Sequence, residues 1–227
     1  MYSNYLSCQK ILDGIQSIDY FLAQQLTDSV LSDVSIEACD KELLFHCVMA
    51  CSEALREGHT CLKLSEISDV TRWQNNEDNK GGYHFPEISV MEHCFNHMNI
   101  SPDAPHPLVY EFSRLYLRRY WSFENELSYA VKQLISKTES IDPDKGRAII
   151  DQLFPDTNNT AEIDWQKVAV ANAIGRQFTI IAGGPGTGKT FTVTKLLAAL
   201  PALADKPLNI AMVAPNGNAA HRLNESL

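Results

Sequence analysis

An eight-residue glycine-rich run could hold the phosphates of a nucleotide. It matches the pattern G-x-x-x-x-G-K-[ST], in which glycines allow a tight turn and successive backbone N–H groups form a nest for an anion. In such a run the lysine reaches the β- and γ-phosphates, and the final hydroxyl holds Mg²⁺. The residues are Gly183, Gly184, Pro185, Gly186, Thr187, Gly188, Lys189 and Thr190. We predict a nucleotide and Mg²⁺ site here, with Lys189 as the catalytic cation that stabilises charge on the γ-phosphate.

The segments on either side of this run are those that a phosphate-binding loop requires. Residues 178–182 are apolar and rich in β-branched side chains, which predicts a buried parallel strand. Residues 191–200 place Val193, Leu196 and Leu200 on one face of a predicted helix. The order strand, glycine loop, helix favours a true phosphate site over a chance glycine-rich turn.

A glutamine lies near the start of a further predicted helix, 163–174, which precedes the strand. Gln166 offers both a hydrogen-bond donor and an acceptor, the pair that can read the N6 amine and N7 of adenine. The alternative interpretation is an ordinary polar helix start. Its position one helix upstream of the strand favours adenine recognition, so we predict ATP as the cofactor.

A second turn could contact a nucleic-acid backbone. It follows another predicted strand, 208–213, and precedes a predicted helix, whose N-terminus can face a phosphate. An ordinary turn between a strand and a helix is the alternative. The predicted DNA-contacting residues are Pro215, Asn216, Asn218 and Arg222.

The sequence predicts an α/β protein with a mainly helical N-terminal domain that contains a small β-hairpin. Helices are predicted at 9–26, 36–57, 87–99 and 123–134, with another ending at Leu153. A strand is predicted at 60–64, a hairpin at 108–120 and an exposed loop at 72–86. We predict an N-terminal domain at 1–155, a linker at 156–162 and the first part of a parallel-sheet P-loop ATPase domain at 163–227.

The chain has a net charge of −9, and the excess of acids lies upstream. Residues 161–227 contain six Lys or Arg and four Asp or Glu, whereas residues 1–160 contain 13 and 24. Because phosphate binding favours basic surfaces, residues 1–160 are a poor candidate for binding nucleic acid. Arg114, Arg118 and Arg119 of the predicted hairpin suggest one alternative, a winged-helix DNA-binding domain. A solvated hairpin is favoured, and the acidic surface either aids solubility or docks a basic protein partner.

Neither a membrane segment nor a metal site is predicted. The N-terminus lacks the basic start and apolar stretch of a signal peptide, and no run reaches the length of a membrane span, so we predict a cytoplasmic protein. The six cysteines form no CxxC pair. We favour reduced, buried thiols over the alternative of a zinc site. Such a site could be assembled from His46, Cys47, Cys51, His93, Cys94 and His97.

Several stretches resemble the RecD family, the α subunit of exodeoxyribonuclease V (RecBCD) and a superfamily-one DNA helicase. The most specific are 164–169, 182–190 and 214–227, and those at 57–65 and 115–121 are similar to the N-terminal domain of the family. The resemblance implies a RecA-like ATPase domain and ATP-driven 5′→3′ translocation on single-stranded DNA. It also implies assembly with RecB and RecC in double-strand-break repair and recombination.

The same resemblance implies roles for particular residues. Gln166 would contact adenine, residues 184–190 would hold phosphates and Mg²⁺, and the turn at 214–222 would touch DNA. In that turn the family usually has Thr and Lys where this chain has Asn216 and Asn218. The loss of a cationic side chain weakens phosphate contact there.

A P-loop ATPase also needs a carboxylate at the end of another core strand, to hold Mg²⁺ and help activate water. After Thr190 the sequence contains two acids, Asp205 and Glu225, and neither follows a predicted buried strand. We therefore expect the N-terminal part of a longer helicase subunit, without ATP hydrolysis by these 227 residues alone. The alternatives are a protein-interaction module with an incomplete nucleotide site, or a stand-alone RecD-like helicase. The stand-alone helicase is less favoured, because no helix-hairpin-helix pattern is found in residues 1–160.

Overall fold

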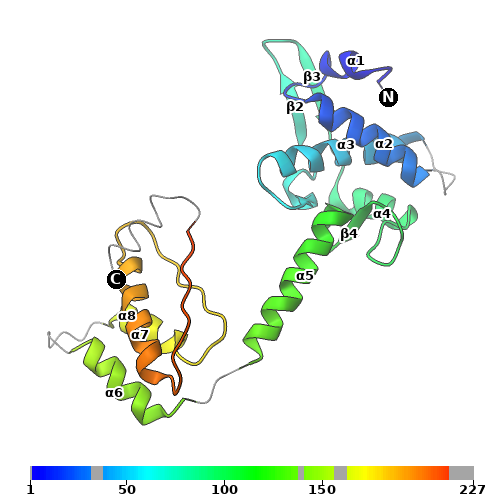
Figure 1. The fold of residues 1–227 in the computed structure, drawn as a ribbon. Coiled ribbons are helices and arrows are strands. Elements are labelled where there is room, and N and C mark those ends of the chain that lie inside the picture. The colour runs from blue at the N-terminus through cyan, green and yellow to red at the C-terminus, as the bar shows by residue number, and fades with distance from the viewer. Residues whose placement is uncertain (1, 32–37, 138–140, 156–162, 215–227) are drawn as a thin grey trace. The chain divides into compact units, whose positions relative to one another are not determined.

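The computed structural model describes residues 2–31, 38–137, 141–155 and 163–214 (Figure 1). It is rich in helices, with two small antiparallel sheets, and divides into two compact units, Met1–Leu127 and Ser128–Leu227. The limits 1–155 and 163–227 stay a prediction, and the compact units divide earlier in the chain. Within the described ranges, no helix is both long and apolar enough to cross a bilayer.

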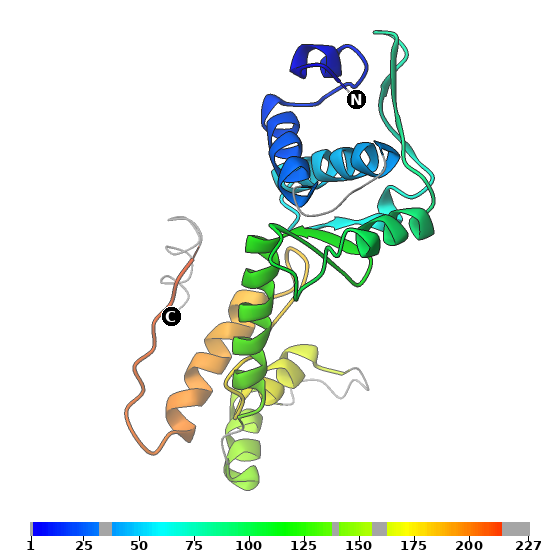
Figure 2. The ribbon, with the colours of Figure 1, turned by 90° about the vertical axis from the view of Figure 1, so that its right-hand side faces the viewer.

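Two packed helices form the centre of the N-terminal unit. They are α2, Ser17–Leu31, and α3, Ala38–Arg56, which lie side by side in both Figure 1 and Figure 2. The helix predicted at 9–26 is wrong in its start, because Gly14 adopts a φ of +73° and a short separate helix, α1 (Tyr5–Gln9), precedes it. Asp19 then accepts a hydrogen bond from the backbone N–H of Gln16, which fixes the start of α2.

The predicted hairpin at 108–120 is confirmed as part of a three-stranded sheet. Its strands are β4, Leu108–Glu111, and β5, Arg114–Leu117. The third strand is β1, Leu62–Lys63, which pairs with β5 and is followed in the chain by a 3₁₀ turn, Leu64–Glu66. The helix predicted at 87–99 is confirmed as α4, Ile88–His97.

The prediction of an exposed loop at 72–86 is wrong, because this segment forms a second hairpin. Its strands are β2, Thr71–Asn75, and β3, Lys80–His84. Trp73 is buried and its indole N–H donates to Glu53 of α3, while Lys80 and Asn75 both donate to Asp13. These contacts come from distant parts of the chain, so the polar local sequence gives no sign of them.

The helix predicted at 123–134 is confirmed, but its apolar side chains do not face a core. The segment lies in α5, Arg118–Ile135, which has no buried residue, and Leu127 is 65% exposed. The first two turns of α5 are tied to the N-terminal unit. The Arg118 guanidinium donates to the carbonyls of Ser101 and Pro102 at 3.0 Å and to two neighbouring carbonyls, the Trp121 indole N–H donates to Glu111 at 2.8 Å, and Glu124 accepts from the Thr60 hydroxyl.

Three helices make up the second unit: α6, Pro143–Leu153; α7, Trp165–Ala173; and α8, Lys189–Leu203. They meet in a small apolar core at Phe154, Val170 and Ala199. The helix predicted to end at Leu153 is confirmed, and so are those predicted at 163–174 and 191–200, whose observed bounds differ by a few residues.

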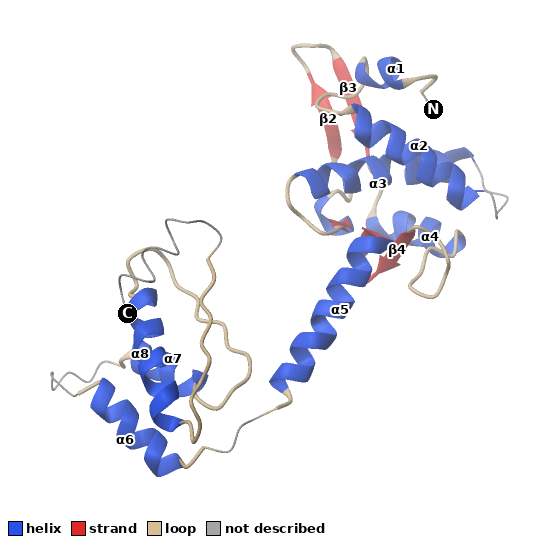
Figure 3. Cartoon of the chain, in the orientation of Figure 1, coloured by secondary structure: helices blue, strands red, loops and turns tan. Residues whose placement is uncertain are grey.

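The two strands predicted beside the glycine loop are not formed. Residues 178–182 and 208–213 are extended loop, drawn in tan in Figure 3, and Ile180 and Val213 are 75% and 91% exposed. A parallel strand takes its ladder hydrogen bonds from neighbours distant in sequence. In the described part of the chain neither run has such a neighbour, so apolar composition alone does not make a strand.

Candidate functional site

The glycine-rich run forms an exposed loop that leads directly into α8. Gly186 and Gly188 have φ angles of +78° and +79°, the left-handed region that glycine adopts without strain, and Gly188 is the N-cap of α8. A side chain at Gly183 would place its Cβ 2.6 Å from the hydroxyl of Thr187. The backbone path itself therefore needs glycine at Gly183, Gly186 and Gly188, as expected for a loop shaped around an anion.

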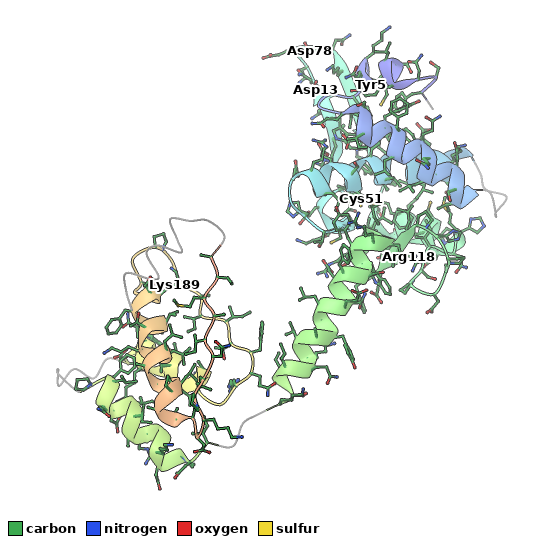
Figure 4. All side chains as sticks on the ribbon, viewed as in Figure 1. Tyr5, Asp13, Cys51, Asp78, Arg118 and Lys189 are labelled. Atoms are coloured by element: carbon green, nitrogen blue, oxygen red, sulfur yellow. The ribbon has the colours of Figure 1, made fainter. Side chains whose placement is uncertain are left out.

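Lys189 lies at the start of α8 (Figure 4), and its ammonium bends back to the loop. Its Nζ donates to the carbonyl oxygens of Gly183 and Gly184, each at 2.6 Å, and the Thr187 hydroxyl donates to Gly184 at 2.9 Å. Because Lys189 is exposed and held only by neutral carbonyls, a phosphate entering the loop would offer it a stronger, charged acceptor.

Gln166 is brought to the same loop from α7. The Asp164 side chain caps α7 by accepting from the backbone N–H groups of Gln166 and Lys167, at 2.9 and 3.1 Å. From this first turn the Gln166 amide donates to the Thr187 carbonyl at 3.2 Å, and it occupies the space that a Cβ at Gly188 would need. The structure thus joins the two sequence-predicted parts of the nucleotide site.

The first turn of α8 presents the remaining predicted residues. Thr190 is exposed next to Lys189, where a hydroxyl is an available oxygen ligand for Mg²⁺. Two residues on, the buried Thr192 donates from its hydroxyl to the Gly188 carbonyl at 3.1 Å. The glycines, the cation and the hydroxyl therefore fit a Mg²⁺–nucleotide, with the backbone N–H groups of the α8 N-terminus beside them.

The remaining predicted residues are those of the DNA-contacting turn and the two acids downstream of Thr190. Pro215, Asn216, Asn218 and Arg222 lie outside the described residues, as does Glu225. Asp205 lies in the bend that follows α8.

A few residues near the loop were not predicted from sequence. Phe154, at the end of α6, contacts Phe191 of α8. The aromatic residue before Pro155 was the only local signal, and it indicates no more than a helix end.

The cysteines do not form a metal site in the residues that the structure covers, where no cluster of potential ligands occurs. Cys47 and Cys51 are buried, and burial raises the pKa of both thiols, that of Cys51 to about 12. Neutral thiols of this kind behave as small apolar side chains.

Two family models match the chain. The model of the RecBCD enzyme subunit RecD, N-terminal domain, matches residues 12–116, and an AAA domain model matches residues 166–227. The chain belongs to the RecD family, matching its N-terminal part. The RecD matches cover the acidic N-terminal unit, and the AAA match covers Gln166 and the glycine loop.

Individual relatives agree with this placement. The RecBCD enzyme subunit RecD of Haemophilus influenzae is 33% identical over 225 residues, which cover 92% of this chain and 34% of that protein. The subunit of Buchnera aphidicola is 37% identical over 122 residues, 53% of this chain and 19% of its own length. The subunit of Mycolicibacterium smegmatis is 41% identical over 117 residues, which cover 50% of this chain and 20% of that protein. The chain therefore spans about a third, or less, of the length of these curated relatives.

Proposed function

We propose that the chain is the N-terminal part of an ATP-dependent 5′→3′ DNA helicase subunit of a RecBCD-type helicase and nuclease. The whole assembly would act in double-strand-break repair and recombination in the cytoplasm. The observation that carries the proposal is the junction of Gln166 with the Thr187–Gly188 backbone, in a chain whose relatives are RecD subunits. The predicted parallel-sheet, RecA-like ATPase fold of 163–227 belongs to this proposal.

Each site residue has a distinct task in binding Mg²⁺–ATP. The backbone N–H groups of residues 184–190 hold the phosphates, and Lys189 exchanges its two carbonyl acceptors for phosphate oxygens. Thr190 would supply an oxygen ligand to Mg²⁺, and the bound ion would neutralise negative charge on the phosphates. Gln166 keeps one amide N–H on Thr187 and turns its remaining donor and its acceptor to adenine.

Nucleotide binding is tested on the chain itself, with a fluorescent ATP analogue and competition by ATP. Replacing Lys189 by Ala removes a charge-assisted contact worth about 1.5–3 kcal/mol, so we expect Kd to rise about 10- to 100-fold. Lys206→Ala, beyond the end of α8, is the matched loss of a lysine and should leave Kd unchanged. Equal affinity of the Lys189→Ala variant and the unaltered chain would refute the site.

We propose that these 227 residues alone bind ATP without hydrolysing it. The carboxylates after Thr190 are Asp205, which lies in the bend after α8 and not at the end of a described strand, and Glu225, which lies outside the described residues. Steady phosphate release from the purified chain, lost in Lys189→Ala, would contradict this.

The partners proposed are RecC and RecB, together with single-stranded DNA at the turn carrying Pro215, Asn216, Asn218 and Arg222. In the N-terminal unit, Leu6 of α1 and Ile18 and Phe21 of α2 are each more than half exposed, and the Phe21 ring lies 6.2 Å from that of Tyr5. These residues form an apolar patch in an acidic unit, which suits a partner surface with an apolar centre and a basic rim.

This docking is tested by co-purifying the chain with RecC of the same source. Phe21→Asp, in the patch, should abolish retention, whereas Phe112→Asp, at the exposed tip of the β4–β5 hairpin, should not. Loss of retention only in Phe112→Asp would move the docking surface to the hairpin. Tight, salt-sensitive DNA binding without RecC retention would instead make the unit a DNA reader.

A further inference from the structure

Helix α6 lies between the two segments that the family models match, residues 12–116 and 166–227. It packs along α8, the helix that carries Lys189 and Thr190. At one end, Lys145 Nζ donates to the carbonyl of Leu203 at 3.2 Å, where a cation also suits the C-terminal end of a helix. At the other end, Phe154 meets Phe191. These two contacts make α6 antiparallel to α8 and place its C-terminal end beside the glycine loop.

The contact at that end is aromatic and well packed on one side. Phe154 is 7% exposed, within the apolar core of the unit, and its ring centroid lies 6.3 Å from that of Phe191 in an edge-to-face arrangement. Lys195, one turn further along α8, places its ammonium 5.0 Å from the Phe191 ring and 5.9 Å from the Phe154 ring.

Phe191 is the residue directly after Thr190, and it is itself 48% exposed. The first turn of a helix lacks intrahelical partners for its N–H groups and is the part most prone to fray. That turn is also where Lys189 and Thr190 must be held if the loop is to receive phosphates. A fixed contact at Phe191 therefore restrains both residues at once.

We propose that Phe154 is a positioning residue of the nucleotide site, through which α6 holds the first turn of α8 in its binding conformation. This inference rests on the proposed function of the loop. Phe154 acts only through Phe191, and it reaches neither the nucleotide nor Mg²⁺. The nucleotide site of this chain thus extends upstream of the AAA match, to a helix with no motif of its own.

The test uses four single variants of the 227-residue chain, Phe154→Ala, Phe154→Leu, Phe191→Ala and Ile150→Ala, and the Phe154→Ala, Phe191→Ala double variant. Ile150 is the matched control, because it also packs on the core of this unit from α6 but carries no aromatic ring that could contact Phe191. For each variant the Kd for ATP is measured below its melting temperature, together with hydrogen exchange of the amides of residues 192–195. These begin with Thr192, whose N–H donates to the Gly188 carbonyl at 2.9 Å and closes the first turn of α8.

We expect Phe154→Ala to raise Kd about tenfold and to speed exchange in the first turn of α8. Phe154→Leu, which keeps apolar bulk, should recover most of the affinity, and Ile150→Ala should lower the melting temperature with Kd within about twofold of the unaltered chain. Phe191→Ala, at a half-exposed position, should reproduce the Kd of Phe154→Ala, and the double variant should add nothing, since both break one contact.

An unchanged Kd in folded Phe154→Ala, or an equal rise in Ile150→Ala, would overturn the inference. If Phe154→Ala does not fold, Phe191→Ala serves as the test by itself, because an unchanged Kd in Phe191→Ala would also overturn the inference. If the unaltered chain binds no ATP, the proposed function fails. In that case, faster exchange at 192–195 in Phe154→Ala but not in Ile150→Ala still supports the positioning contact, and equal exchange in the two variants refutes it.

Discussion

A buried histidine makes the stability of the N-terminal unit depend on pH. His46 of α3 is fully buried, with its ring stacked on Tyr83 at a centroid distance of 3.5 Å and an interplanar angle of 5°. Its Nδ1 donates to the Glu42 carbonyl at 2.7 Å, because a carbonyl oxygen only accepts, so Nε2 accepts from the Tyr2 hydroxyl at 2.9 Å. The neutral ring therefore has both nitrogens satisfied, and a second proton would remove the acceptor for Tyr2.

Burial lowers the pKa of His46 to about 4, against about 6.5 in an unfolded chain. The unfolded state binds the proton more readily, so the stability is fully present above pH 6.5 and is lost as pH falls from 6.5 towards 4. With these two values the linkage relation gives a loss of about 2 kcal/mol between pH 8 and pH 5 from this one side chain.

The assay is urea unfolding at pH 8 and pH 5, followed by tryptophan fluorescence. Trp73 is buried in this unit, whereas Trp165 of the second unit is 72% exposed, so the signal reports mainly on the N-terminal unit. We expect His46→Gln to reduce the pH dependence by about 2 kcal/mol, whatever it does to stability at pH 8. His93→Gln, at an exposed site on α4, should retain the full dependence. An unaltered slope in His46→Gln would refute the reasoning.

Two other substitutions test the packing described above. Gly188→Ala should raise the Kd for ATP at least about tenfold, because a side chain there meets both a positive φ and the Gln166 amide. Gly81→Ala, in the β2–β3 hairpin where a Cβ meets nothing, is the control in the same titration. Asp19→Ala should lower the unfolding free energy by about 3–5 kcal/mol in urea titrations, since Asp19 is buried and accepts from Ser52 and Arg56. A loss below about 1 kcal/mol would mean that the pair is effectively solvated.

The sequence by itself was sufficient to predict the glycine loop, the helices around it and the RecD relationship. These features are local: residues 183–190 match a fixed spacing, and α7 and α8 follow from apolar periodicity. The β4–β5 hairpin was also predictable, because its two strands are neighbours in the chain. The nucleotide-site assignments themselves stay predictions until binding is measured.

Other features were decided only by tertiary contacts. The β2–β3 hairpin forms in a polar segment because Trp73, Asn75 and Lys80 find partners on α3 and near Asp13, tens of residues away. Apolar runs at 178–182 and 208–213 stay outside any strand, because a ladder depends on a neighbouring strand and not on composition. Likewise, nothing local to Phe154 points to Phe191, 37 positions later by their residue numbers, and only the packing of α6 along α8 brings them together. Local sequence fixes backbone preferences over a few residues, whereas the free energy of burial depends on which distant surfaces meet.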